Sequence, residues 1–355
     1  MSDVSSNDES DIALVMAMIL GTMVATIAGL VLFQSPSKNG GENFLPTLEE
    51  EPSKRAYELF ALTYTPIWIF AFGCIVAFGL YERFDEWSYL YVCVGLALPF
   101  LLQPIIMPSA GFGSPDAQRP LLERYAFKAN MWLAVYSFIG NYWYTHCKYP
   151  ASSCNQYHYS RMSDRWIPNL LVFLLFFTPP DFYSVLKAKY TMPAHRLNNV
   201  PIALYFATHF YFSTYHVFSN LLLRKIVTSY QAGFGRSVLY VAVVMAFSYF
   251  TAFMETLTIS AYPDYSFEDR NMAYTVGSAF YGIYFLVSFP AFSRFDSDID
   301  NDNNKGQGRA VGIWETVVSS CGYGMMIMIL LDFVRLYLDI PLIVGKSNVI
   351  CSTVS

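Results

Sequence analysis

Long apolar segments, separated by short polar ones, follow one another along most of this chain of 355 residues. A helix needs about twenty apolar residues to cross a bilayer. Segments near or above that length lie at 12–33, 57–80, 87–107, 127–146, 200–223, 238–262, 272–292 and 313–338. We therefore predict an all-α fold: a polytopic membrane helical bundle of about seven spans, preceded by one extra N-terminal anchor helix.

The polar segments divide the chain into regions. Residues 1–11 form a polar N-terminus, 12–33 the transmembrane anchor, 34–56 a linker, 57–338 the bundle and 339–355 a C-terminal tail. The apolar run 12–33 has no basic residues before it and is longer than the core of a signal peptide, so we interpret it as an anchor. Its low aromatic content distinguishes it from the later spans.

Composition agrees with a membrane protein and narrows its partners. Hydrophobic residues make up 54% of the chain and charged residues 14%, whereas a soluble domain carries about 25% charged residues. The net charge of −5 and the lack of a basic stripe indicate no nucleic-acid partner. Aromatic residues reach 18%, which fits interfacial belts, a ring-lined pocket for a flat apolar ligand, or both.

The segment 200–223 carries no Asp, Glu, Lys or Arg, yet it is marked by a regular polar pattern. Positions spaced four, three, four and four residues apart fall on one stripe of a helix; they are Tyr205, His209, Phe212, His216 and Asn220. Lipid cannot satisfy polar groups, so this stripe must face protein or a cavity.

Two other spans carry aligned polar residues. In 127–146 these are Asn130, Ser137 and Asn141, and in 238–262 they are Ser248, Thr251 and Glu255. Glu255 is the one carboxylate of its span. An ionised acid costs several kcal/mol at bilayer depth, so we expect Glu255 to be paired or protonated.

Three interpretations of the histidines compete. His209 and His216 are separated by seven residues, about 10.5 Å along a helix, and ligands of one zinc must each approach it to about 2.1 Å; we expect no metal. Either histidine can be a structural side chain that bridges helices. The third interpretation is proton transfer, since ionisable groups inside a membrane are candidate functional residues. Motifs for a nucleotide or another cofactor are absent from the sequence.

Several stretches resemble the cycloeucalenol cycloisomerase family of plants and algae. They include KANMWLAVYSFIGNYWYTH (128–146), YTMPAHRLNNVP (190–201), THFYFSTYHVFSN (208–220), SYFTAFMETLTISAYPDYSFEDR (248–270), FYGIYFLVSFPAFSRFD (280–296) and LLDFVRLYL (330–338). The resemblance extends in order from about Ala56 to Leu338. It implies a multi-pass enzyme of the endoplasmic reticulum membrane that opens the cyclopropane ring of cycloeucalenol to give obtusifoliol without a cofactor. The expected partners are a membrane-embedded sterol and the lipid bilayer.

The implied reaction needs one acid to protonate the cyclopropane and one base to remove a neighbouring ring proton. Burial favours an uncharged carboxyl and a neutral imidazole, so Glu255 fits the acid and His209 or His216 the base, although the reverse assignment also fits. Aromatic faces would stabilise the cationic intermediate. The predicted substrate-binding residues are polar or aromatic side chains of the spans: Asn130, Asn141, Tyr205, Phe212, Asn220 and Tyr281.

The chain departs from this family at two places. The anchor 12–33 has no counterpart in the plant proteins, and residues 147–181 interrupt the resemblance. We interpret 147–181 as a retained intron. Codons for Cys147, Lys148 and Tyr149 can contain a splice-donor sequence, and codons for Pro180 and Asp181 can contain a splice acceptor. A lineage-specific loop is the alternative. Two rival functions also remain: a sterol double-bond isomerase acting on a substrate without a cyclopropane, and a non-enzymatic sterol-binding or transport protein.

Overall fold

The computed structural model describes residues 6–37, 43–48, 51–109, 115–144, 188–190, 192–198, 200–260, 265–267, 277–299 and 311–337. The insert 147–181 and the tail 339–355 lie outside these residues. The described chain is almost entirely helical, as predicted. Its long helices are α1 (Ser6–Leu32), α2 (Pro52–Ala77), α3 (Glu86–Ser109), α4 (Tyr125–Ile139), α7 (Ile202–Ser229), α8 (Phe234–Ser260), α10 (Ser278–Ile299) and α11 (Ile313–Tyr337).

Short elements complete the fold. They are the 3-10 helices η1 (Leu80–Arg83) and η2 (Leu121–Glu123), the π-helical turn η3 (Gly140–Tyr144), and the strands β1 (Ala188–Tyr190), β2 (Arg196–Leu197), β3 (Val200–Pro201) and β4 (Tyr265–Phe267). The strands form two antiparallel pairs, β1 with β4 and β2 with β3. Each of the eight expected spans corresponds to one long helix, with ends shifted by a few residues.

In the part of the chain that the structure describes, five helices are long enough and apolar enough to cross a membrane. The apolar stretches lie at Leu14–Leu32, Pro52–Ala77, Glu86–Met107, Phe234–Thr258 and Ile313–Leu331. The other three expected spans form α4, α7 and α10. Helix α4 has 15 residues, which reach only about 22 Å and fall short of the ~30 Å hydrocarbon core. Buried polar side chains lower the hydropathy of α7, and α10 carries serines, tyrosines and the exposed Arg294.

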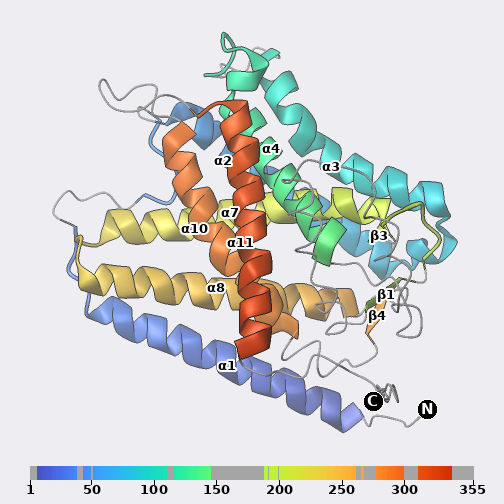
Figure 1. The fold of residues 1–355 in the computed structure, drawn as a ribbon, viewed down its shortest axis with the longest axis horizontal. Coiled ribbons are helices and arrows are strands. Elements are labelled where there is room, and N and C mark those ends of the chain that lie inside the picture. Colours follow the sequence, from blue (N-terminus) through green and yellow to red (C-terminus); the bar gives the residue numbers. More distant parts are fainter. Residues whose placement is uncertain are drawn as a thin grey trace, which may run out of the picture.

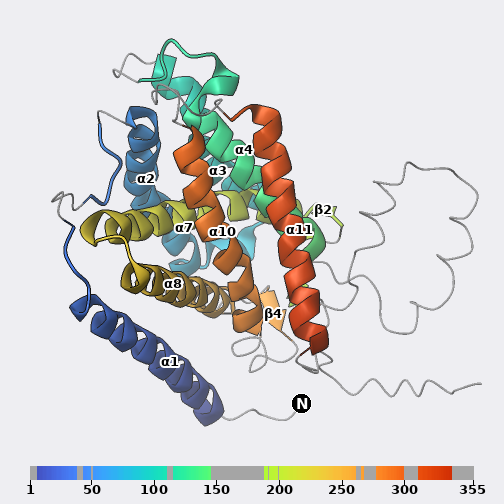
Figure 2. The same ribbon diagram turned by 60° about the vertical axis from the view of Figure 1, so that its left-hand side comes forward.

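Helix α7 occupies the centre of the fold and contacts α2, α3, α4, α8 and α10. Figure 1 shows α7 and α8 lying side by side, with α1 along the outer side of α8. Helices α10 and α11 run across the α7–α8 pair, and Figure 2 shows the same crossing after rotation. The helices therefore form crossing layers around α7, and most of the residues that α7 buries are polar or aromatic.

Helices α4 and α10 interlock through two tyrosines. The Tyr136 hydroxyl donates to the carbonyl of Tyr284 at 2.8 Å, and the Tyr284 hydroxyl donates back to the carbonyl of Tyr136. A Cβ atom at Gly140 would lie 2.7 Å from the Tyr284 hydroxyl oxygen. Any larger residue at Gly140 would displace that ring, so this glycine permits the close contact between α4 and α10.

Candidate functional site

The two histidines of α7 are both buried, but they have different partners. The Nε2 atom of His209 lies 3.0 Å from Oδ1 of Asn130 on α4. The amide nitrogen of Asn130 donates to the carbonyl of Ala126 at 2.8 Å. This bond assigns the acceptor oxygen of Asn130 to His209, so His209 carries its proton on Nε2. Its Nδ1 atom is enclosed and has no hydrogen-bond partner among the described residues.

His216 is engaged at both ring nitrogens. Its Nδ1 donates to the carbonyl of Phe212 at 2.8 Å, and its Nε2 lies 3.0 Å from the Ser288 hydroxyl of α10, from which it accepts. The imidazole is fully buried and contacts five aromatic rings, those of Trp132, Tyr136, Phe212, Phe289 and Phe292. His216 therefore has no lone pair or proton left for a ligand in this arrangement.

Glu255 of α8 meets a tyrosine of the neighbouring helix. The Tyr281 hydroxyl of α10 donates to Oε1 of Glu255 at 3.0 Å, and the hydroxyl of Tyr215 on α7 faces the same carboxyl. The other oxygen, Oε2, is enclosed and has no hydrogen-bond partner among the residues described. The side chains of Glu255, Tyr215 and Tyr281 are each only partly buried. The carboxyl thus lies at a contact of three helices, and its residue keeps some exposed surface.

Aromatic rings lie between the Glu255 cluster and His216. Phe285 contacts the rings of Tyr281 and Tyr215 on one side, at centroid distances of 5.0 and 5.8 Å, and that of Phe212 on the other, at 5.5 Å. Phe212 in turn contacts the His216 imidazole. The acid and the histidine are therefore neighbours of one aromatic cluster and make no direct hydrogen bond to each other.

Other predicted site residues bind protein groups. Asn141, in the π-helical turn, donates to the hydroxyl of Thr208 and to the carbonyl of Ser137. The Tyr205 hydroxyl donates to the carbonyl of Leu197 at 3.1 Å. Both contacts lie near the start of α7. They tie that end of the helix to its neighbours rather than presenting polar groups to the Glu255 cluster.

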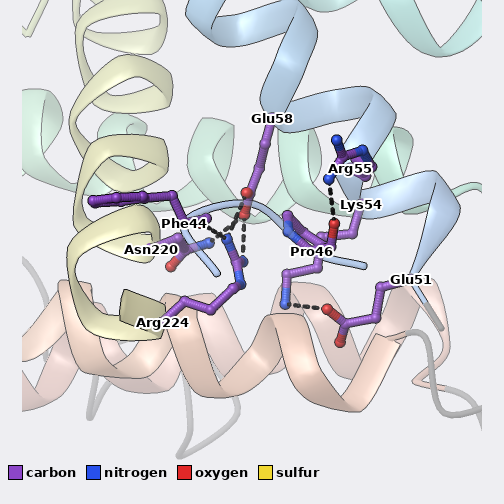
Figure 3. A network of polar contacts seen from close by, with 8 residues as sticks. All are labelled: Phe44, Pro46, Glu51, Lys54, Arg55, Glu58, Asn220 and Arg224. Atoms are coloured by element: carbon purple, nitrogen blue, oxygen red, sulfur yellow. Dashed lines mark hydrogen bonds and ion pairs between the residues drawn. The ribbon is translucent and has the colours of Figure 1, made fainter. Parts of the chain in front are cut away.

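Asn220 belongs to a separate buried network near the other end of α7 (Figure 3). Arg224 donates to both carboxylate oxygens of Glu58 on α2, at 2.7 and 2.8 Å, and Asn220 donates to the same carboxylate at 3.4 Å. Arg224 also donates to the carbonyl of Phe44, at 2.8 Å, and the Lys225 ammonium lies 4.8 Å from the Phe44 ring centroid. The network joins the segment before α2 to the end of α7.

Sequence reasoning missed three partners in these clusters: Glu58, Tyr215 and Ser288. Glu58 sits at the edge of an apolar run, where an acid is unremarkable, although Arg224 at the end of another span offers a matching charge. Tyr215 lies next to the polar stripe of α7 rather than on it. Ser288 is one hydroxyl in an aromatic segment, and its sequence context carries no signal that it would meet His216.

The described residues contain no group of three or more His, Cys, Asp or Glu side chains that could hold a metal ion.

Comparison with known proteins gives one informative match. The curated cycloeucalenol cycloisomerase of Arabidopsis thaliana is 35% identical to the chain over 309 residues, which cover 84% of this chain and 92% of that protein. No family model matches the chain, and no solved structure matches it.

Proposed function

The chain belongs to the cycloeucalenol cycloisomerase family of sterol isomerases, and from this premise we propose that it opens the cyclopropane ring of a 9,19-cyclosterol, converting cycloeucalenol to obtusifoliol. Substrate and product are isomers, so the enzyme must supply one proton and remove one. Protonation of the cyclopropane methylene breaks a ring bond and leaves a tertiary cation on the adjacent carbon. Loss of a proton from the next ring carbon then forms the double bond, and no electron transfer is needed.

Glu255 serves as the acid in this proposal. A cyclopropane is a weak base, so the donor must be an uncharged acid held close to the ring in a site that excludes water. The Tyr281 hydroxyl occupies Oε1, which leaves Oε2 as the oxygen that carries the transferable proton. This enclosed, unpartnered oxygen, on the one carboxylate of the 238–262 span, is the single observation that carries the proposal.

His209 serves as the base. A base needs a free lone pair, and the Nδ1 atom of His209 has no partner among the described residues. Both nitrogens of His216 are occupied, so we assign His216 a structural role that joins α7 to α10. The proton taken by His209 must return to Glu255 before the next turnover, by way of exchange with solvent.

Aromatic side chains complete the proposed site. A cationic intermediate is stabilised by ring faces and is lost if water captures it. The ring of Tyr281, which binds the acid, contacts Phe285, and Phe285 contacts Phe212. Phe212 follows His209 by three residues on the same stripe of α7, and we propose Phe212 and Tyr281 as sterol contacts. Asn141, Tyr205 and Asn220, which bind protein groups, then act by holding α7 in place.

We place the enzyme in the endoplasmic reticulum membrane, where its sterol substrate would be dissolved in the bilayer. Five apolar helices support membrane insertion. The rival double-bond isomerase would use the same acid and base on a sterol without the cyclopropane, and a sterol-binding protein would use neither.

Expression in microsomes that lack the activity tests the proposal. The chain is supplied with cycloeucalenol, and the products are identified by mass spectrometry. The chain is expressed both with and without residues 147–181. A cyclopropyl isomerase makes obtusifoliol, and the form without residues 147–181 is the active one if these residues are a retained intron. Turnover of a non-cyclopropyl sterol alone would favour the double-bond isomerase, and binding of sterol without any product would favour the transport protein.

A further inference from the structure

We propose that Asn130 is a positioning residue for the reaction: its side-chain oxygen holds the proton of His209 on Nε2 and so keeps the Nδ1 lone pair free for the sterol. The inference rests on the proposed function, since it gives His209 the role of base. It replaces the direct sterol contact expected of Asn130 from the sequence.

The hydrogen bonds around Asn130 favour one orientation of its amide. Its nitrogen donates to the carbonyl of Ala126 on the same helix, and its oxygen accepts from His209. A rotated amide would face its nitrogen towards Nε2–H and its oxygen towards the Ala126 carbonyl, so both bonds would be lost. The buried side chain, 5% exposed, has little access to solvent that could replace them.

The tautomer of His209 with its proton on Nδ1 is disfavoured for two reasons. A proton on Nδ1 would be a buried donor with no acceptor among the described residues, and the bare Nε2 would face the lone pairs of Asn130 Oδ1 across 3.0 Å. Both defects cost free energy in a buried site, because an unsatisfied polar group pays its full desolvation penalty. Asn130 therefore selects the tautomer by the same logic as the aspartate of a Ser-His-Asp triad.

The support for Asn130 is itself rigid. Two residues further along α4, the carbonyl of Trp132 accepts from the Ser320 hydroxyl of α11 at 2.7 Å. One turn beyond that, Tyr136 is bound to Tyr284 of α10. Contacts with two other helices thus hold the segment of α4 that presents Asn130 to His209.

His216 provides an internal contrast. Its proton lies on Nδ1, because Nδ1 faces the Phe212 carbonyl of its own helix. The proposal therefore predicts opposite tautomers for the two buried histidines of one helix. Ser288 donates to His216 but does not choose its tautomer, so Ser288→Ala is a matched control for substitutions of Asn130.

The test combines nitrogen NMR with kinetics on the full chain in lipid bilayers. Histidine is labelled with ¹⁵N, and the signals of His209 and His216, two of five histidines, are assigned by their loss in His209→Gln and His216→Gln. The wild type should show Nε2–H for His209 and Nδ1–H for His216. Asn130→Leu should abolish the preference of His209 and lower kcat by roughly 10²–10⁴-fold with little change in KM, a loss of the size that mispositioned bases show.

Asn130→Asp keeps an acceptor oxygen, so it should retain the Nε2–H tautomer and recover most of kcat. If Asn130→Leu fails to accumulate, the tautomer and kcat of Asn130→Asp still test the proposal. Ser288→Ala should keep the Nδ1–H tautomer of His216 and turn over within a few-fold of wild type. A wild-type His209 protonated on Nδ1, a kcat that Asn130→Leu leaves unchanged, or an Asn130→Asp as inactive as Asn130→Leu would overturn the proposal.

The two proposals fail in different ways. An active wild type whose His209 carries its proton on Nδ1 would refute the role of Asn130 and leave the isomerase function standing. A wild type with the predicted tautomers that makes no product from cycloeucalenol would refute the isomerase function, and with it any catalytic role of the Asn130–His209 contact.

Discussion

Tyr281 of α10 donates its hydroxyl to Oε1 of Glu255 on α8 at 3.0 Å, across the contact between these two helices. Because the bond engages one carboxyl oxygen and leaves Oε2 without a partner among the described residues, it orients the acid as well as binding it. In the proposed mechanism, Oε2 carries the proton that Glu255 donates.

Glu255→Gln should lower kcat by at least ~10²–10⁴-fold, the contribution typical of a positioned acid. Glutamine keeps the shape of the side chain and can still accept from Tyr281, but it has no transferable proton. Turnover of cycloeucalenol is measured in microsomes at matched protein levels. Tyr281→Phe is the companion variant: it keeps the acid and loses only its orientation, so its loss should be smaller. A Glu255→Gln protein that binds sterol and turns over within a few-fold of wild type would remove Glu255 from the mechanism.

His209→Gln should mainly lower kcat, whereas His216→Gln should mainly lower thermal stability. His209→Gln removes the base, so kcat should fall about as far as in Glu255→Gln, while the folded protein persists. His216→Gln removes a hydrogen-bonded side chain that fills an aromatic cluster, so the main loss should be in the midpoint of thermal unfolding. The comparison uses kinetics and thermal unfolding of the same detergent-purified samples. Equal kinetic losses with no change in unfolding would show that the assignment of the base is wrong.

Single substitutions in the pair Glu58–Arg224 should destabilise the fold strongly. The Glu58 side chain has no exposed surface and the Arg224 side chain is 14% exposed. Glu58→Gln removes the negative charge from this contact and should cost about 3 kcal/mol of unfolding free energy, the lower end of the range for breaking a buried pair. Adding Arg224→Met removes the positive charge as well and should recover most of the loss. Unfolding is followed by circular dichroism in detergent.

Glu86→Gln is the control for Glu58→Gln. Glu86 lies 3.9 Å from His195, and the two side chains are 50% and 38% exposed, so the loss of this contact should change stability by less than about 1 kcal/mol. The account of the buried network fails if the two substitutions destabilise the protein equally.

The N-terminal region should divide into a helix that turnover does not need and a following segment that stabilises the fold. Only 6% of the residues in the apolar stretch Leu14–Leu32 are buried, so a chain lacking residues 1–33 should keep its turnover once inserted. A chain lacking residues 1–48 also loses the Phe44 carbonyl that accepts from Arg224 and the backbone bond between Ser37 and Ser229. It should unfold at a lower temperature. Turnover lost on removal of residues 1–33 from a folded, membrane-integrated protein would contradict this division.

Local periodicity predicted a large part of this arrangement. The polar stripe of 200–223 identified His209 as a candidate site residue, and the aligned polar residues of 127–146 identified Asn130, which the structure shows to be its hydrogen-bond partner. Helical spacing can single out such residues because it decides which side chains share a face. The all-α fold and the approximate ends of the helices follow from apolar segments in the same way.

Pairing between helices could not be predicted in this way. Nothing near His216 in the sequence indicates Ser288, and Glu255 meets Tyr215, which lies beside the stripe. The crossing of α10 over α7 and α8 is set by how side chains interdigitate between helices, which hydropathy does not report. For the same reason, Asn220 was assigned to the substrate although it binds Glu58.

Turnover of cycloeucalenol in deuterium oxide tests the central claim most directly. Microsomes containing the chain are equilibrated in deuterium oxide, and the sterol product is analysed by mass spectrometry. If an acid that exchanges with solvent protonates the cyclopropane, and a base removes a different hydrogen, obtusifoliol should carry one deuterium, located in the new methyl group. Failure to form obtusifoliol, or obtusifoliol without deuterium in that methyl group, would contradict the account.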